Sequence, residues 1–348
     1  MYRSHGTKGT NRAYWSAQYA PVFPLIRQAL ALRLALAPYL YTAARQAHDS
    51  GTAAVRALYI DAPEEEASYS NNQTFMHGDS LLVRPITQSM EPGGGSTRMA
   101  TVPCRGGQSA PCISVWLPPS TIGWVYWGGG LGGLYTGVPA SGGDVVVEGG
   151  RGELPLFVRS GAVVPLLPVG SLDATAAGAK GTGINWALFT GAEGTAPMPP
   201  CHNCPPSKPN CFPCPPDTGS GTRYFDDGDS TAYEGKAGRY ATQTFNFSLT
   251  KNPHRIKATI GAAVAVGGFT LPASHRVLHT VELRGRHAPN LATADGVEMN
   301  CTVVGWDPTA PGGGKAVPGA DLARPEGTTM CVAGAAGLAE TMQLVFEW

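Results

Sequence analysis

Glycine and proline divide this chain into short segments, and that punctuation restricts what it can fold into. Its 348 residues include 46 glycines and 30 prolines, while charged residues make up only 14% of the total. Both residue types interrupt helices and favour turns, so such a composition favours many short strands over long helices. We therefore expect an α+β chain that is mostly β.

One segment departs from this pattern and repeats apolar residues at helical spacing. Between 21 and 48, Leu25, Leu32 and Leu36 share one face, which predicts an amphipathic helix. Pro38 removes a backbone donor and crowds the preceding turn, so we expect a bend near Ala35 rather than an end. Polar residues and a glycine directly after the segment are expected to end the helix.

After this helix the hydrophobic period falls toward two, which is typical of strands separated by turns. A first group of strands is predicted within 80–84, 113–117, 124–127, 144–147 and 156–164, forming a sandwich or barrel of antiparallel sheet. A second group, and a second sandwich, is predicted within 185–190, 223–225, 241–249, 255–260, 277–284 and 341–348.

Length and charge restrict the function classes. A chain of 348 residues exceeds what one hydrophobic core usually supports, so we expect two or more domains. The 25 basic and 25 acidic residues balance and are mixed along the chain, which argues against nucleic acid as a partner. No apolar stretch reaches the roughly 18 residues that a membrane span needs. A neutral polyol such as a sugar fits this charge balance.

Signals for localisation are few. Met1 is not followed by a basic and then an apolar segment, so the chain shows no secretory signal of its own. Glycosylation sequons begin at Asn72, Asn246 and Asn300, although such triplets also arise by chance. We favour the secretory pathway or the extracellular space for the full-length protein.

Cysteine is concentrated in a low-complexity segment, 191–221, which like 89–108 has too few large apolar side chains to predict packed structure. Paired C-x-x-C units can form a zinc site, but the short proline-filled spacer stiffens this segment against folding around a metal. We therefore expect disulfides or unpaired thiols and assign no metal ligand. The cysteines concerned are Cys104, Cys112, Cys201, Cys204, Cys211 and Cys214, while Cys301 and Cys331 are candidates to bridge the last hairpins.

An acidic run at 224–230 invites a calcium interpretation. It lacks the glycine at the sixth position and the glutamate at the twelfth that an EF-hand loop needs. Because Asp and Gly supply tight-turn geometry, we predict a turn between two strands.

Several segments follow one another in an order that resembles a known enzyme family. They are Arg3-Ser4-His5-Gly6, then LAPYLYT at 36–42, HGDSLLVRP at 77–85, GWVYW at 123–127 and LPLFVRSGAVVP at 154–165. Together they resemble the last barrel strand, last barrel helix and trailing β domain of glycoside hydrolase family 31. The 224–230 turn is also similar to a structural turn in the far C-terminal domain of that family.

The resemblance implies three parts. Residues 1–60 would be the C-terminal end of a (β/α)8 catalytic barrel, and 61–175 would be a proximal β-sandwich domain. Residues 176–348 would be a distal β-sandwich domain with the Pro/Cys insertion at 191–221. The expected fold class is therefore α+β, mostly β, with the tail of a (β/α)8 barrel followed by two antiparallel β-sandwich domains.

His5 is the one candidate site residue. In family 31 the last barrel strand ends in an Arg-x-His run whose histidine donates hydrogen bonds to the sugar, and Arg3-Ser4-His5 occupies that place. The resemblance therefore implies that His5 binds substrate at the rim of a barrel, where function concentrates in this architecture. Without these neighbours a lone histidine would be interpreted as structural.

The catalytic carboxylates are missing from the sequence. Retaining glycosidases need a nucleophile and an acid/base, and family 31 carries both aspartates in segments before the Arg-x-His run that do not occur here. Asp61, Asp79 and the glutamates at 64–66 belong to the trailing domain and should be solvated. We expect no catalytic residue and no cofactor in this chain, and we expect that it needs missing N-terminal barrel segments.

The implied function is that of the C-terminal part of a retaining α-glycosidase, inactive alone, whose complete form hydrolyses α-glucosides or α-xylosides. Its substrate would be an oligosaccharide or other α-glycoside. One alternative is a non-catalytic carbohydrate-binding or structural β-sandwich module. A related retaining α-galactosidase family is another, and the segment at 155–159 argues against it.

Overall fold

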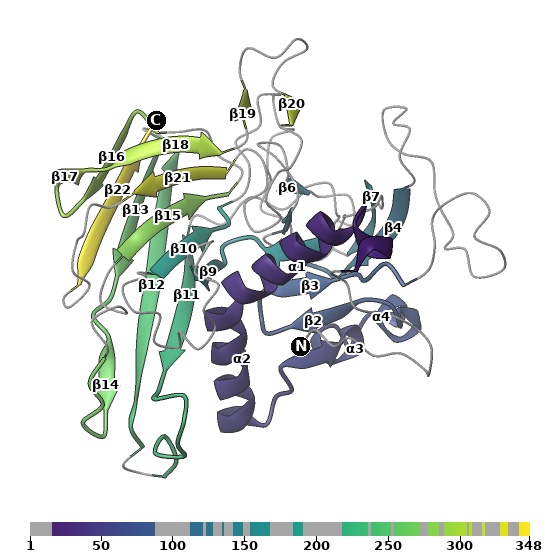
Figure 1. Ribbon diagram of the computed structural model, residues 1–348, viewed down its shortest axis with the longest axis horizontal. Helices are drawn as coiled ribbons and strands as arrows, with labels where there is room; N and C mark the ends of the chain where they lie inside the picture. Colours follow the sequence, from purple (N-terminus) through teal and green to yellow (C-terminus); the bar gives the residue numbers. More distant parts are fainter. Residues whose placement is uncertain are drawn as a thin grey trace.

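The structure is a computed structural model, in which strands predominate and the helices lie early in the chain (Figure 1). It describes residues 16–87, 112–120, 123–127, 134–135, 142–148, 154–167, 184–190, 218–235, 238–251, 254–271, 278–284, 289–304, 306–307, 315–316, 328–332 and 341–348. The prediction of a mostly β chain is confirmed.

The single amphipathic helix predicted for 21–48 is instead two helices that meet at a bend, and only the second of them is amphipathic. A 3-10 turn, η1 (Ala17–Tyr19), precedes α1 (Phe23–Ala35) and α2 (Ala37–Ser50), and Figure 1 shows the two helices meeting at an angle. Pro38 lies in the first turn of α2, where a missing N–H is tolerated. The bend lies where it was predicted, but α1 ends at Ala35 and a new helix begins at Ala37, so the expectation of no helix end there was wrong. Gly51 ends α2 in the left-handed conformation, with φ of 76°.

A six-stranded antiparallel sheet follows the helices. Its order is β1 (Val55–Ala57), β2 (Phe75–His77), β3 (Leu81–Val83), β8 (Leu156–Arg159), β5 (Trp124–Tyr126) and β6 (Leu134–Tyr135). Two short helices, α3 (Leu58–Asp61) and α4 (Glu66–Ser70), connect β1 to β2. A separate antiparallel pair is formed by β4 (Cys112–Leu117) and β7 (Gly143–Glu148).

The six-stranded sheet contributes to two cores, one on each face. Leu82 and Phe157 pack with Ile113 and Val115 of β4 in the first core. Leu81, adjacent to Leu82, packs instead with Leu32, Tyr39 and other residues of α1 and α2. Since successive side chains of a strand point to opposite faces, β3 separates the helices from the β4–β7 pair.

Two further sheets pack against each other. One has the order β18 (Asn300–Val304), β21 (Thr328–Val332), β15 (Leu278–Leu283), β10 (Ile184–Leu188) and β9 (Val163–Leu166). The other has seven strands: β11 (Thr218–Phe225), β12 (Tyr240–Lys251), β13 (His254–Ile260), β22 (Met342–Glu347), β16 (Leu291–Ala294), β17 (Val297–Glu298) and β14 (Val264–Val266), which pairs with β12. Trp186, Phe245 and Phe346 are fully buried in the core between them. A small hairpin consists of β19 (Trp306–Asp307) and β20 (Lys315–Ala316).

Two strand predictions need correction. The predicted strand at 156–164 is two strands, because Gly161 adopts φ of 85° and turns the chain from β8 in one sheet to β9 in another. The expectation of wholly antiparallel sheets is also wrong, since β10 and β15 run parallel. Parallel partners need a long connection, and 188 and 278 are separated by the whole β11–β14 region.

A disulfide links two neighbouring strands of the five-stranded sheet. Cys301 on β18 and Cys331 on β21 are paired directly in the ladder and bonded to each other, which confirms the suggested bridge. Cys112 is also disulfide-bonded. Among the helices that the structure describes, none is long and apolar enough to cross a membrane.

Gly221 marks a close approach between β11 and β9 that admits no side chain. A Cβ atom at this position would lie 1.8 Å from the carbonyl oxygen of Val163. Ser220 donates its backbone N–H to Gly161 at 3.0 Å, so the two backbones are held together here.

The substitution Gly221→Ala should therefore destabilise the chain by about 1–3 kcal/mol or more, because it forces two bonded backbones apart. The measurement is the free energy of unfolding in urea, with Thr222→Ser on the exposed side of the same strand as the control. If both variants unfold at the wild-type denaturant concentration, the close approach has no structural importance.

Candidate functional site

The predicted sugar contact, His5, lies outside the described residues, and so do Cys104 and the four cysteines between 201 and 214. His5 therefore stays a prediction. In the described ranges, no group of three or more His, Cys, Asp or Glu is placed to hold a metal ion.

Tyr39 brings two of the family-like segments, 36–42 and 77–85, into direct contact. Its hydroxyl donates a hydrogen bond to the carbonyl of His77 at 2.8 Å and accepts one from the N–H of Ser80 at 3.0 Å. Gly78, with φ of +63°, passes so close that a Cβ atom there would lie 2.4 Å from the hydroxyl. Burial raises the pKa of Tyr39 to about 12, so the hydroxyl keeps its proton at neutral pH.

Asp61 forms an ion pair with the buried Arg56 and is largely shielded from water, so it is not solvated as the sequence suggested. Its oxygens accept hydrogen bonds from Nε of Arg56 at 2.9 Å and from Nη2 at 2.8 Å. Only 13% of the Asp61 side chain is exposed, and the paired guanidinium compensates for the lost water. The hydrogen bond to Asp61 raises the pKa of Arg56. Asp79 is 69% exposed, and Glu64 and Glu66 are exposed, as predicted.

A second contact joins α2 to β11 and β12. The guanidinium of Arg45 lies over the ring of Tyr240 at 4.4 Å and over that of Tyr224 at 5.0 Å, a cation–π arrangement. The N–H of Tyr224 also donates to the hydroxyl of Thr42 at 3.0 Å. The helix therefore holds the six-stranded and the seven-stranded sheets at the same time.

The acidic run after β11 forms a turn, as predicted. Asp226 accepts the N–H of Gly228 at 2.9 Å, and Asp227 accepts the N–H of Ser230 at 3.0 Å and its hydroxyl at 2.5 Å. Hydrogen bonds from Ser230 hold the pKa of Asp227 below its ordinary value. These carboxylates fix the turn backbone rather than facing a common centre.

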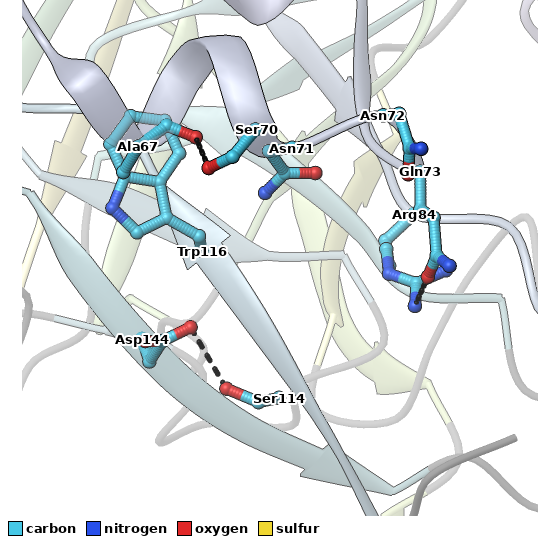
Figure 2. Close-up of a pocket in the computed structure, with 9 residues that line it drawn as sticks. All are labelled: Ala67, Ser70, Asn71, Asn72, Gln73, Arg84, Ser114, Trp116 and Asp144. Atoms are coloured by element: carbon cyan, nitrogen blue, oxygen red, sulfur yellow. Dashed lines mark hydrogen bonds between the residues drawn. The ribbon is translucent and has the colours of Figure 1, made fainter.

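A pocket of about 390 Å³ lies between α4, the loop that follows it, and the β4–β7 pair. Figure 2 shows Trp116 beside Ala67 and Ser70, with the bonded Ser114–Asp144 pair below and the Arg84–Gln73 pair on the other side. The residues that line it are Ala67, Ser70, Asn71, Asn72, Gln73, Arg84, Ser114, Trp116 and Asp144.

Strand alternation explains how the pocket obtains its wall. On β4 the residues Ile113, Val115 and Leu117 are buried in the core, so Ser114 and Trp116 face the opposite side. Sequence reasoning missed this site because its residues come from four separate segments. The available signal was a polar and an aromatic residue on the outer face of a half-buried strand.

Arg84 is the main charged group of the pocket. Arg84 is only 7% exposed. Its Nη1 donates a hydrogen bond to the carbonyl of Pro85 at 2.6 Å, and its Nη2 donates one to Oε1 of Gln73. In the described part of the chain no carboxylate pairs with it, and burial lowers its pKa. The side chains of Asn71 and Asn72 make no hydrogen bond to any described residue, and Asn72 is exposed.

A smaller pocket of about 280 Å³ lies between the end of α2 and the turn at Gly78 and Asp79. Its charged groups, Asp49, Arg56 and Asp79, are all engaged in ion pairs within the fold.

Residues 51–164 match the family model for the glycosyl hydrolase family 31 C-terminal domain. The chain contains the C-terminal domain of glycosyl hydrolase family 31. In the structure, the matched residues run from the cap of α2 to β9, so this family 31 domain includes the six-stranded sheet, the β4–β7 pair and the pocket beside α4.

Sequence relatives agree with this assignment. The chain is 31% identical over 142 residues to a probable glucan 1,3-alpha-glucosidase of Oryza sativa, across 40% of this chain and 12% of that protein. It is 23% identical over 269 residues to a probable alpha/beta-glucosidase of Aspergillus fumigatus, across 77% of this chain and 23% of that protein. The chain therefore spans less than a quarter of the length of either relative.

A shared fold extends beyond the family 31 domain. A GH31 dextranase of Flavobacterium johnsoniae, solved with isomaltotriose, has a TM-score of 0.63 to this chain at 19% identity. The similarity covers 98% of this chain and 34% of the dextranase.

Removing the Tyr39 hydroxyl should loosen the attachment of α2. The variant Tyr39→Phe leaves the N–H of Ser80 without its partner, so we expect a loss of about 1–3 kcal/mol in the free energy of unfolding. Tyr69→Phe is the matched control, since its hydroxyl donates to Pro63 at the surface. Equal stability of the two variants would show that the buried hydroxyl is dispensable.

The two carboxylates around Arg56 should differ in importance. The variant Asp61→Asn should destabilise the chain by roughly 2 kcal/mol or more, because the buried guanidinium loses its charged partner. Asp79→Asn should cost at most about 1 kcal/mol, because that carboxylate is exposed. Thermal unfolding of both variants tests this, and a larger effect at Asp79 would contradict it.

Proposed function

We propose that this chain is the C-terminal portion of a retaining α-glycosidase that hydrolyses the O-glycosidic bonds of α-glucosides or α-xylosides. Residues 1–60 would contain the end of a (β/α)8 barrel, and 61–175 and 176–348 would contain the sandwich domains that support it, with β1 of the six-stranded sheet and β9 of the five-stranded sheet lying just across these borders. The observation that carries this proposal is the family 31 C-terminal domain at 51–164, directly preceded by a helix pair that packs on its sheet.

The surface of α1 supports the proposal that further barrel segments cover it. Ten of its thirteen residues are apolar or proline, in the sequence FPLIRQALALRLA, yet only Leu32 and Ala35 are buried. A helix that is apolar on all sides normally lies within a core. Phe23 is 37% exposed, and Leu25, Ile26 and Leu30 are only partly buried.

This surface also argues against the alternative of a self-sufficient carbohydrate-binding module. Such a module would need only the sheets, and it would not keep an apolar helix exposed to water. The α1–α2 pair is also hydrogen-bonded to the five-stranded and seven-stranded sheets. Leu167, directly after β9, donates its N–H to the carbonyl of Ala35, and Tyr224 of β11 donates its N–H to the hydroxyl of Thr42.

In the proposed enzyme, the two reacting carboxylates belong to barrel segments that are not encoded in this sequence. One would attack the anomeric carbon and the other would protonate the leaving oxygen, and then activate water to release the covalent intermediate. His5 would donate hydrogen bonds to sugar hydroxyls and so orient the ring for attack. The helix pair and sheets would hold the strand that carries it.

Disulfides support a secretory or extracellular location for the full-length protein. The bond between Cys301 and Cys331 and the bonded state of Cys112 are typical of oxidising compartments.

The purified chain alone should not hydrolyse an aryl α-glucoside above the uncatalysed rate, because it lacks the carboxylate pair. The measurement is release of the aryl group, and robust turnover by the chain alone would overturn the proposal.

In the enzyme extended by its barrel segments, His5→Ala should lower kcat/KM by roughly 100-fold, as for other lost donors to a transition state. His48→Ala, at the exposed end of α2, is the matched control and should retain activity. Equal kinetics for the two variants would remove His5 from the site.

A further inference from the structure

We infer that the pocket beside α4 binds a terminal sugar of a neutral α-linked glucan. The pocket belongs wholly to the family 31 C-terminal domain, because all its lining residues lie between 67 and 144. The neutral-sugar chemistry follows from the pocket itself. The α-glucan class rests on the proposed function.

Free hydrogen-bonding groups surround the pocket on three sides. A guanidinium has five N–H donors, and Arg84 uses only two of its nitrogens for the bonds to Pro85 and Gln73. Asn71 and Asn72 each offer an amide with both donor and acceptor, and neither bonds to another described residue. Asp144 uses Oδ1 to accept the Ser114 hydroxyl at 2.9 Å and keeps its other oxygen available.

Trp116 adds an aromatic surface to these polar groups. The Trp116 side chain is partly buried and lies beside Ala67 and Ser70 in the pocket wall (Figure 2). Small-molecule sites combine such an apolar surface with a few convergent polar groups. A pyranose ring matches both features, because its C–H face is apolar and its rim carries hydroxyls.

The balance of charge favours a neutral ligand over an anion. The pocket wall contains one cation, Arg84, and one anion, Asp144. The two charges cancel, so the wall carries no net charge to attract an anion. Hydroxyl groups suit both side chains, since a hydroxyl can accept from a guanidinium or donate to a carboxylate.

Size and exposure indicate one end of a longer chain. The volume of about 390 Å³ lies in the lower part of the roughly 300–1,000 Å³ range of ligand pockets. Asn72 and Asp144 are exposed, so the pocket opens to solvent and the remaining sugars can extend outward. One ring would be held and the rest would stay in water.

The test is calorimetric titration of the full chain with maltotriose and isomaltotriose, compared with cellotriose, glucuronate and inorganic phosphate. The protein should come from a bacterial host that forms disulfides but attaches no N-glycan, because Asn72 begins a sequon and a glycan there would block the pocket. We expect saturable, millimolar binding of an α-linked trisaccharide and no comparable binding of the other three probes.

The variants Asn71→Ala and Asp144→Ala should each weaken that binding by about tenfold, which corresponds to a loss of about 1.4 kcal/mol. Asn246→Ala and Asp229→Ala change exposed residues of the same types elsewhere and should leave binding unchanged. Thermal unfolding of all four variants shows whether the fold is kept, and because the mutated side chains are at the surface or partly exposed we expect wild-type stability.

Absence of saturable binding would overturn the inference, as would binding that survives both pocket variants or tighter binding of glucuronate or phosphate. A preference for cellotriose would overturn the α-glucan class. These readouts need no hydrolysis, so they are independent of the aryl α-glucoside assay. Failure of the pocket to bind sugar therefore leaves the proposed glycosidase function standing. Failure of the glycosidase proposal would likewise leave the binding of a neutral sugar in this pocket standing.

Discussion

The attachment of α2 to two sheets is the constraint on which the arrangement of this chain depends. On one side Tyr39 fits over Gly78 and holds the turn between β2 and β3 through its hydroxyl. One turn further along the helix, Thr42 accepts the backbone N–H of Tyr224 in β11. Nearly one turn beyond it, Arg45 lies over the rings of Tyr224 and Tyr240. A helix with partners on both sides cannot rotate about its axis, so the direction of α1 is fixed as well. In the proposed enzyme, this attachment would keep the helix pair and the β domain in one orientation.

Local features were the ones that the sequence could predict. The bend before Pro38 and the end at Gly51 follow from the covalent geometry of those residues, and both occur where expected. The alternation along β4 likewise follows from one buried face. The break between β8 and β9 was missed because the whole run from 156 to 166 is buried apart from Arg159, which is partly exposed, so apolar periodicity could not mark the turn.

Features that depend on distant partners could not be predicted. Asp61 is largely shielded from water because it pairs with Arg56, and no spacing rule reveals that pair. The parallel pairing of β10 with β15 joins segments some ninety residues apart in the chain. The pocket beside α4 assembles residues from four segments, each of which is unremarkable by itself. His5 could be proposed only through the resemblance of its neighbours to family 31.

The connection between β8 and β9 has a mechanical consequence. Only Ser160, Gly161 and Ala162 separate a strand of the six-stranded sheet from a strand of the five-stranded sheet, and all three are buried and bonded. Independent motion of two units needs an exposed, flexible linker, which this connection does not provide. A load applied to one sheet is therefore transmitted to the other without slack, and a protease would find no hinge here at which to separate them.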